Sequence, residues 1–304
     1  MKTLIVITGP TAVGKTVLTI DLARHFGTDI INADSRQIYR ELKIGTAAPT
    51  DEQLRQVHHH FVGTKSIHDY YNASMYEQEV LECLKVLPSE INILSGGSMM
   101  YIDAVCHGID DIPTIREDIR EDIKRRYREE GLEALCEDLR RLDPEHYAVV
   151  DRQNQRRVIH ALEICYQTGK TYTSFRKKEQ NKQQDSRPFR MVKIGLNRER
   201  QELYDRINAR VDQMMTDGLL QEAEALYPYR QLNALNTVGY KEMFDYMDGR
   251  WSLDEAVERM KGNTRRYARK QLTWFKRDPL VRWFHPDQQD AIMEYINKSL
   301  YVTN

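Results

Sequence analysis

Residues 9–16 read GPTAVGKT, between an apolar run at residues 4–7 (LIVI) and a helical pattern that starts at Val17. The stretch matches Gly-x-x-x-x-Gly-Lys-Ser/Thr, the pattern of a phosphate-binding loop, in the strand–loop–helix setting that such a loop requires. The backbone N–H groups point at anionic oxygens, the lysine adds a positive charge, and the following helix N-terminus completes the anion site. The stretch predicts a phosphate site after the first strand. Which phosphate is held, and whether it is transferred or leaves, stays open.

Strands and helices alternate around this loop. We expect strands at residues 4–7, 29–32 and 91–95 and helices at 17–26 and 75–87. This order predicts an α/β fold: a P-loop NTPase-like parallel sheet flanked by helices. Polar or glycine-rich loops follow the strands at 9–16, 33–39 (ADSRQIY) and 95–101 (SGGSMMY), and in such sheets they converge on one site.

The chain changes character near residue 114. Residues 116–130 (REDIREDIKRRYREE) begin a charged, all-helical insertion that continues to about residue 168. Residues 176–190 carry six basic and two acidic side chains and almost no apolar ones, which predicts a mobile loop. That loop either lies along a polyanion or is a solvated linker. We divide the chain into a first core part (1–113), a helical insertion domain (114–190) and the completion of the core (191–304).

The last part of the chain is expected to return to the sheet. An apolar strand at 191–196 precedes Asn197, which is placed to cap a helix with a core-facing stripe. The stripe consists of Leu203, Ile207, Val211, Met214 and Leu220. A final long helix opens with the capping box Ser252-x-x-Glu255 and carries eight Lys or Arg and no acid over residues 259–277. These cations either contact phosphates or pair with the acidic insertion.

The composition argues against a protein that binds nucleic acid through its overall charge and against a membrane protein. Forty-five basic and 46 acidic residues give a formal charge of −1, so only local patches could bind nucleic acid. No stretch near 18 apolar residues is present, and we expect a cytoplasmic chain without membrane contact.

Four separated cysteines are expected to be reduced. The run His58-His59-His60 resembles a metal cluster, but consecutive strand residues point to alternating faces, so all three cannot easily share one ion.

Asp34 is the first candidate for chemistry outside the loop. It follows the second strand within residues 32–39 (NADSRQIY) and should face the phosphate loop across the crevice. A carboxylate there either binds the Mg²⁺ of a nucleotide or acts as a base on an acceptor group. The strand at 91–94 ends in Ser95 and not in a Walker B aspartate, which weakens an NTPase interpretation.

Eight motifs in series resemble the tRNA dimethylallyltransferases. In chain order they are GPTAVGKT (9–16), ADSRQIY (33–39), IGTAAP (44–49), YNA (71–73), GGS-x-x-Y (96–101), N-x-RRVI-x-ALE (154–163), VGY (238–240) and RKQ-x-TWF (269–275). The resemblance covers residues 3–284. The chain departs from the family pattern at Ala48, His58, Ser98 and His160, and none of these positions removes a catalytic group.

The resemblance implies transfer of a dimethylallyl group from dimethylallyl diphosphate to N6 of adenosine 37, next to the anticodon, in tRNAs that read codons beginning with U. The products would be N6-dimethylallyladenosine and diphosphate. Asp34 would accept the amino proton, Lys15 and Thr16 would stabilise the leaving diphosphate, and Thr16 would hold the cofactor Mg²⁺. The diphosphate loop would comprise Gly9, Pro10, Thr11, Ala12, Val13, Gly14, Lys15 and Thr16.

The same resemblance implies that the adenine is flipped out of its stack to reach the site. The tRNA anticodon stem-loop would be contacted by Asp34, Ser35, Arg36, Gln37, Ser98, Arg120, Arg156, Arg157, His160, Val238, Gly239, Tyr240 and Lys241, together with the 176–190 loop and the basic C-terminal helix. We expect a monomer.

Two other functions remain open from the residues alone. A small-molecule P-loop kinase would use Asp34 as base and close the insertion over the γ-phosphate as an arginine-bearing lid, for which the charged stretch around 116–128 is suited. The kinase interpretation gives the basic C-terminal helix no function. A noncatalytic or ATP-gated RNA-binding protein would keep its affinity and biological activity without Asp34.

Overall fold

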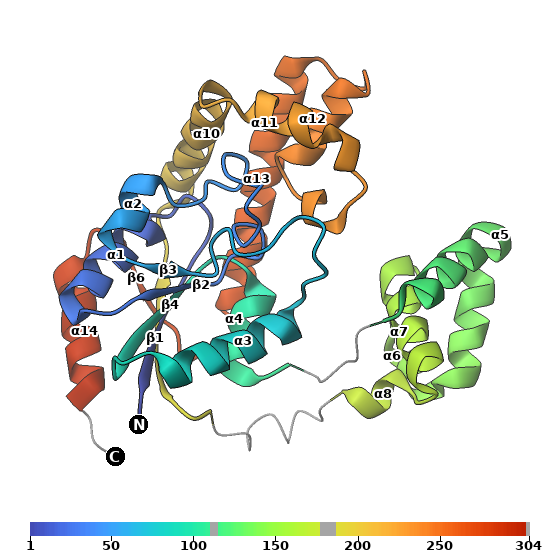
Figure 1. The fold of residues 1–304 in the computed structure, drawn as a ribbon, viewed down its shortest axis with the longest axis horizontal. Helices are drawn as coiled ribbons and strands as arrows, with labels where there is room; N and C mark the ends of the chain where they lie inside the picture. Colours follow the sequence, from blue (N-terminus) through green and yellow to red (C-terminus); the bar gives the residue numbers. More distant parts are fainter. Residues whose placement is uncertain (110–114, 177–186, 302–304) are drawn as a thin grey trace. The chain divides into compact units, whose positions relative to one another are not determined.

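Six strands form one parallel sheet in the order β3-β2-β4-β1-β5-β6 (Figure 1). They are β1 (Thr3–Thr8), β2 (Ile30–Asn32), β3 (His59–His60), β4 (Ile91–Ser95), β5 (Arg190–Leu196) and β6 (Arg282–Phe284). The structure is a computed structural model that describes residues 1–109, 115–176 and 187–301. It forms two compact units, Met1–Cys106 with Arg187–Asn304, and His107–Ser186. The predicted fold class is confirmed.

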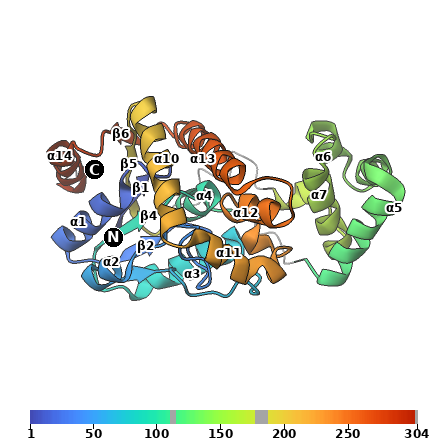
Figure 2. The same cartoon turned by 90° about the horizontal axis from the view of Figure 1, so that it is seen from above.

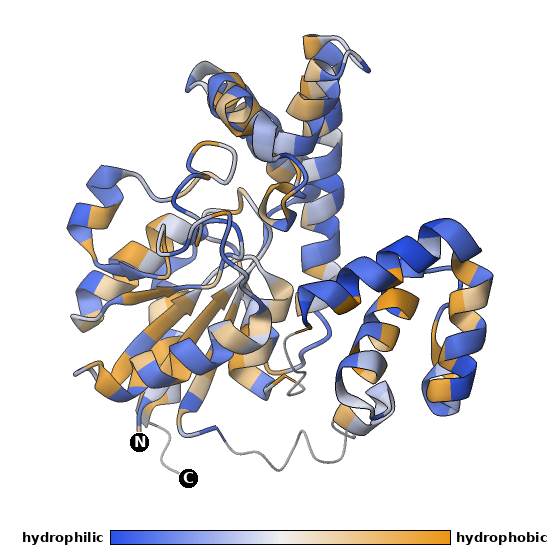
Figure 3. Cartoon of the chain, turned by 45° about the vertical axis from the view of Figure 1, so that its right-hand side comes forward, coloured by the Kyte–Doolittle hydropathy of each residue, from blue (hydrophilic) through white to orange (hydrophobic). Residues whose placement is uncertain are grey.

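Helices cover both faces of the sheet. Leu4 and Val6 of β1 belong to a core shared with α3 (Ala73–Val86) and α4 (Met99–His107). Ile5 and Ile7 point to the other face, toward α1 (Lys15–Phe26) and α14 (Gln289–Tyr301). Figure 2 shows these helices around the strands, and in Figure 3 the central strands are mainly hydrophobic, as burial on both faces requires. No helix in the described ranges is both long and apolar enough to span a membrane.

The first unit has further helices, and all but α2, which contacts α1, gather beyond the carboxyl ends of the strands (Figure 1). They are α2 (Asp51–Gln56), α10 (Arg200–Thr216), α11 (Leu219–Leu226), α12 (Tyr240–Met247) and α13 (Leu253–Phe275), with 3-10 turns at Tyr227–Tyr229 and Asn233–Leu235. The predicted capping box at Ser252 is confirmed. The predicted cap at Asn197 is wrong, because α10 starts later and Glu199 accepts the hydrogen bond from Gln201 N.

The apolar stripe predicted for one helix is divided between two. Gly218 adopts φ 102°, a left-handed conformation that ends the α10 segment and precedes α11, so Leu220 belongs to the second helix. The other four members of the stripe are buried on α10, as expected for core residues. The sequence pattern alone did not reveal the break because the apolar spacing continues across it.

The second unit is all-helical. It contains α5 (Glu117–Leu142), α6 (Pro144–Val149), α7 (Gln155–Thr168) and α8 (Tyr172–Phe175). Helix α5 is kinked at Gly131 (φ 82°), and its apolar side packs on α7 through Leu135, Leu139 and Leu162. The unit comprises residues 107–186. The sequence analysis placed the insertion at residues 114–190.

Residues 177–186 of the predicted basic loop lie outside the described residues. Residues 187–189 are described and form no helix or strand, as a loop would. Arg187 forms an ion pair with Glu77 at 2.6 Å, and Arg190 begins β5 and donates to the main-chain oxygen of Ser299. These two arginines are anchored in the first unit because the strand starts earlier than its apolar pattern suggests. The four cysteines are free thiols, as predicted.

The close approach of β2 and β4 gives a stability prediction. A Cβ at Gly96 would lie 2.1 Å from the main-chain oxygen of Ala33, so Gly96→Ala must move backbone. We expect it to lower the free energy of unfolding by about 2 kcal/mol or more. Gly262→Ala is the matched control: it lies inside α13 with only ordinary contacts at 3.8 Å and should raise stability by about 0.5–1 kcal/mol. Urea unfolding measures both, and a tolerated Gly96→Ala would contradict the prediction.

Candidate active site

The phosphate loop is held in a conformation that needs its glycines. Gly9 has φ 148°, and a Cβ there would lie 2.7 Å from the main-chain oxygen of Leu196. Gly14 has φ 109° and is the N-cap of α1. Ala12, between them, also adopts a positive φ of 62°. The loop therefore passes close to β5 and turns its backbone toward the first turn of α1, which is the arrangement of an anion-binding loop.

The half-buried Lys15 side chain folds back onto this loop. Its Nζ donates to the main-chain oxygens of Gly9 at 2.9 Å and Pro10 at 2.8 Å. The pKa of Lys15 is lowered to about 7, mainly by desolvation and also by the positive charge of Arg210, while Asp34 opposes the shift. An anion bound in the loop would favour the charged lysine and reverse the shift.

Two adjoining cavities meet at Asp34. One, of about 540 Å³, contains the phosphate loop; the other, of about 360 Å³, lies beside it. They share Thr11, Asp34, Thr46, Arg210 and Tyr267. The first is also lined by Ala12, Val13, Gly14, Lys15, Thr16, Gln37 and Gln271, and the second by Ser35, Arg36, Ser98, Ile207, Val211, Val238, Lys241 and Met260. The predicted convergence of three strand-end loops is confirmed by this arrangement.

Asp34 is positioned by the turn that follows β2. Its Oδ1 accepts hydrogen bonds from the main-chain N–H groups of Arg36 at 2.9 Å and Gln37 at 3.3 Å. The buried Ser98 Oγ accepts from Ser35 N at 2.7 Å and donates to Ser35 Oγ at 3.0 Å. These bonds tie the loop after β2 to the loop after β4, so the carboxylate sits on a fixed backbone.

Arg36 and Gln37, predicted to contact tRNA, make bonds to the protein main chain. Arg36 Nη1 donates to the oxygens of Asn233 at 3.0 Å and Ala234 at 3.1 Å. Gln37 Nε2 donates to the oxygens of Thr46 and Ala47 at 3.1 and 3.0 Å. Both side chains therefore shape the cavity walls by holding two loops against the turn after β2.

Glu222 holds the loop at residues 43–45. Its two oxygens accept from the N–H groups of Lys43, Ile44 and Gly45, at 2.8 to 3.1 Å, and from Tyr240 Oη at 2.6 Å. Burial, together with the Glu222 charge, raises the pKa of Tyr240. Tyr240 is fully buried, so its ring makes no surface contact with RNA in this conformation; it supports the loop instead.

Gly239 is the start of α12, with φ 101°, and its N–H donates to Glu242 Oε2 at 2.7 Å. A Cβ there would meet Met260 Cε at 3.3 Å. Of the predicted 238–241 group, Val238 and Lys241 therefore line the second cavity, while Gly239 and Tyr240 act through backbone shape and packing.

Helix α10 and the residues just before it also supply arginines to the site. The sequence analysis had considered only the apolar stripe of this helix. Arg198, which precedes the helix, donates from Nε to Val13 O at 2.9 Å, and Arg206 does the same to Ala12 O at 2.9 Å. Arg210 lines both cavities, and burial lowers its pKa while Asp34 opposes the shift. The spacing of Arg206 and Arg210, one turn apart and off the apolar stripe, was the signal that could have identified them.

Gln271 of α13 joins two of the strand-end loops. Its Oε1 accepts from Thr11 N at 2.9 Å, and its Nε2 donates to Gly97 O at 2.8 Å. It is buried, and it belongs to the quoted 269–275 motif, to which the sequence analysis gave no chemical role. Its position explains why a glutamine stands among arginines on that helix.

The basic surface of α13 is partly neutralised within the first unit. Lys261 pairs with Asp212 at 2.8 Å, Arg265 donates to Asn208 and Arg269 donates to Tyr204 Oη at 2.8 Å, all on α10. All three partners belong to the same unit as α13, and only Lys261 has a carboxylate among them. Arg259 stacks on Trp251 with its guanidinium carbon 3.5 Å from the ring centroid.

The predicted tRNA contacts on the second unit lie on α5 and α7. Arg120 and His160 flank the buried Glu163, each at 3.8 Å. Arg156 and Arg157 are exposed in the first turn of α7, where Asn154 is the N-cap. The structure brings these four side chains to one region of this unit.

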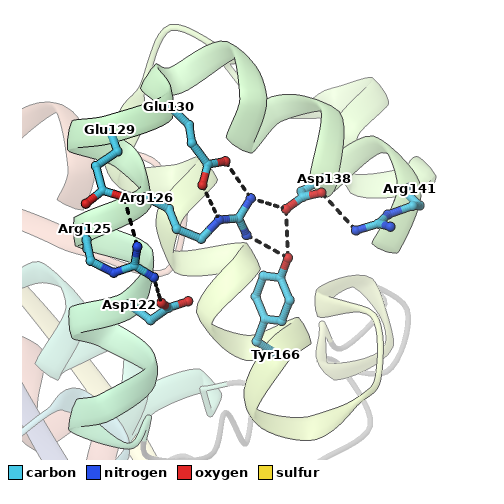
Figure 4. Close-up of polar contacts among 8 residues, drawn as sticks. All are labelled: Asp122, Arg125, Arg126, Glu129, Glu130, Asp138, Arg141 and Tyr166. Carbon is cyan, nitrogen blue, oxygen red and sulfur yellow. Dashed lines mark hydrogen bonds and ion pairs between the residues drawn. The ribbon is translucent and has the colours of Figure 1, made fainter.

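The charged stretch of α5 is largely paired within the second unit (Figure 4). Arg126 binds Glu130 and Asp138, at 2.9 and 2.8 Å, and donates to Tyr166 Oη at 3.0 Å. Hydrogen bonds with these carboxylates raise the pKa of Arg126. Arg125 pairs with Asp122 and with Glu129. These arginines already have carboxylate partners, which weakens the kinase-lid interpretation.

Comparison with known proteins supplies the family. The model of the family described as IPP transferase matches residues 37–278. The chain belongs to the IPP transferase family. It is 61% identical over 297 residues to tRNA dimethylallyltransferase 1 of Phocaeicola vulgatus, covering 97% of this chain and 98% of that protein. For the same-named protein of Bacteroides fragilis, the identity is 58% over 301 residues, with 98% and 99% covered.

Solved structures of the IPP transferase family agree with the fold. The full-length tRNA isopentenylpyrophosphate transferase of Bacillus halodurans has a TM-score of 0.71 at 36% identity, with 99% of this chain and 97% of that one covered. A eukaryotic dimethylallyltransferase, solved acting on tRNA, has a TM-score of 0.73 at 28% identity, covering 90% of this chain and 70% of that chain. The predicted family is confirmed.

The lowered pKa of Lys15 predicts how anion binding depends on pH. Below about pH 7 the lysine of the free protein is already charged, whereas above it binding must take up a proton. The ratio of wild-type to Lys15→Met affinity for inorganic diphosphate should therefore fall as pH rises above about 7, by up to about tenfold per pH unit. Calorimetry on both proteins measures it, and the ratio cancels the titration of diphosphate itself. A ratio independent of pH would show that Lys15 does not gain a proton when the anion binds.

Glu222→Gln should loosen the loop that it holds. The substitution removes the charge from three main-chain hydrogen bonds and should lower the free energy of unfolding by about 1–3 kcal/mol. Amide hydrogen exchange at residues 43–45 should accelerate more than exchange in the strands. Glu224→Gln, at an exposed position of the same helix, is the control and should change neither quantity. Unchanged exchange at residues 43–45 would show that Glu222 does not hold the loop.

Proposed function

We propose that this chain transfers the dimethylallyl group of dimethylallyl diphosphate to N6 of adenosine 37, beside the anticodon of tRNAs that read codons beginning with U. The observation that carries the proposal is the pair of cavities that meet at Asp34, one lined by the phosphate loop from Thr11 to Thr16 and the other by that loop at Thr11 alone. A prenyl transferase needs this division, because its donor ends in diphosphate and its acceptor is a neutral amino group. The names of the relatives support the same reaction.

The diphosphate belongs in the first cavity. The main-chain N–H groups of the loop, the half-buried Lys15 and Arg210 supply positive charge there. They stabilise the charge that grows on the diphosphate as the carbon–oxygen bond breaks, which is often the largest single contribution to catalysis. Arg206 and Gln271 keep the loop in shape through their bonds to Ala12 and Thr11.

The oxygen donors of this cavity fit the predicted Mg²⁺. Thr16 presents a hydroxyl in the first turn of α1, and Asp34 presents a carboxylate to the same cavity. Mg²⁺, when bound, neutralises charge on the diphosphate oxygens. Thr16 is the residue that would hold it, since Asp34 is kept for the proton of the acceptor.

The adenine belongs in the second cavity. Asp34, Ser35 and Ser98 provide polar groups on one side, and Ile207, Val211 and Met260 provide an apolar wall. A base in a tRNA loop reaches such a cavity by leaving its stack, and an apolar wall replaces the stacking that is lost. Val238 and Lys241 lie at this cavity and are placed to contact the nucleotide.

The transfer breaks the bond between C1 of the prenyl group and the diphosphate oxygen and forms a bond from C1 to adenine N6. The proton of N6 goes to the Asp34 carboxylate, and diphosphate leaves with the bonding electron pair. Asp34 lines both cavities, so the same carboxylate faces the reacting amino group and the donor side.

The anticodon stem-loop is the proposed partner, with the basic groups of α7 and α13 as phosphate contacts. Arg156 and Arg157 are exposed on α7, and Arg259 is held on Trp251 near the start of α13. We propose that the chain acts as a monomer in the cytoplasm.

Asp34→Asn tests the proposal. Asparagine keeps an Oδ1 for the hydrogen bonds from Arg36 and Gln37 but cannot take the proton, so transfer should fall by about 10²–10⁴-fold. The rate is measured as label that enters an unmodified tRNA with adenosine 37 in the presence of labelled dimethylallyl diphosphate and Mg²⁺. A tRNA with guanosine 37 gives the background. Asp69→Asn is the control, since Asp69 accepts a turn N–H from Ser66 away from both cavities.

Each outcome of this assay bears on one alternative. Label in tRNA with wild type and Asp69→Asn, but not with Asp34→Asn, supports the base. ATP-dependent phosphorylation of a small acceptor without label in tRNA would replace the proposal with the kinase. RNA binding without either reaction would replace it with the noncatalytic binder.

A further inference from the structure

Three potential metal ligands meet at the edge of the sheet, away from the active site. They are Asp29, His58 and His60, one atom of each lying within 4.8 Å of the others. Strand β3, which carries His60, is the edge strand and pairs in parallel with β2. The register aligns Ile30 with His59, and Ile30 N donates to His58 O at 2.9 Å. The edge therefore places Asp29 beside the start of the histidine run.

Alternation along the strands selects two of the three histidines. Successive side chains point to opposite faces, so His58 and His60 share a face while His59 turns away. His59 is buried, and its Nδ1 lies 2.8 Å from Val57 O. The rings of His58 and His60 are in edge contact, with centroids 4.5 Å apart. His60 Nε2 lies 2.9 Å from Asp29 Oδ2, so two of the donors are already adjacent.

We propose that Asp29, His58 and His60 form a binding site for one divalent transition-metal ion of the zinc class. Two imidazole nitrogens and a carboxylate oxygen suit Zn²⁺, Co²⁺ or Ni²⁺, whereas Mg²⁺ prefers oxygen ligands alone. The side chains of His60 and Asp29 are 24% and 37% exposed, so an ion can enter from solvent and water can complete its coordination.

The geometry needs only a small adjustment. Donors around a tetrahedral zinc ion at about 2.0–2.1 Å lie about 3.3 Å apart. His58 is exposed, so its ring can rotate to bring its nitrogen from within 4.8 Å to that separation. A bound ion would join the residue before β2 to the edge strand β3. It would therefore fasten the most weakly paired end of the sheet, where the strand is two residues long.

Zinc titration of the tag-free full-length protein tests this. Calorimetry should show one site, and zinc should raise the melting temperature. His58→Ala should weaken zinc binding by about tenfold or more and remove the thermal shift, because it deletes one of three ligands. Asp29→Asn should also weaken binding while keeping an oxygen for His60. With Co²⁺ as the probe, wild type should show a visible absorption band that His58→Ala lacks.

Two controls separate this site from other zinc ligands. His25→Ala removes an exposed histidine on α1, and Cys83→Ser removes a half-buried free thiol. Both should bind zinc as wild type does. Undiminished binding in His58→Ala and Asp29→Asn, loss of binding only in Cys83→Ser, or no zinc-dependent thermal shift in wild type would each overturn the proposal. None of these readouts depends on prenyl transfer.

Discussion

No side chain fits between the backbones that meet at the carboxyl ends of the central strands. A Cβ at Gly96 would lie 2.1 Å from Ala33 O, and one at Gly9 would lie 2.7 Å from Leu196 O. Because these residues lack side chains, the loops after β1, β2 and β4 come together over one crevice. The position of Asp34 beside the phosphate loop, the division into two cavities and the bridging role of Gln271 all depend on that approach.

The crevice is electrostatically unfavourable until an anion enters it. Lys15 and Arg210 are half-buried beside the same cavity, and desolvation lowers the pKa of each, with the charge of Asp34 only partly opposing the shift. A protein selected for stability alone would not keep two cations there. An anion bound between them would remove the repulsion. The free energy that the fold gives up in the unliganded state would then be recovered as affinity for that anion.

The sequence predicted the parts of this structure that are encoded locally. Strand β4 was placed at its observed bounds, and the capping box at Ser252 was correct, because apolar runs and caps are properties of adjacent residues. The loop at 9–16 and the family motifs identified the fold and the family. The cap at Asn197 and the continuity of α10 through Leu220 were wrong, since an early helix start and a break at Gly218 are decided by packing. Likewise, the histidine run could not reveal its relation to Asp29, which depends on strand pairing.

Two of the site residues that sequence reasoning missed, Arg206 and Arg210, differ from other arginines of the chain in their partners. Arg125 and Arg126 bind carboxylates of their own unit, so their charge is neutralised where it lies. Arg206 and Arg210 instead donate to main-chain oxygens of Ala12 and Thr46. A carbonyl orients a guanidinium without cancelling its charge, so such an arginine still attracts an anion. A net charge near zero conceals this difference between arginines whose charge is cancelled by carboxylates and arginines whose charge remains available to an anion.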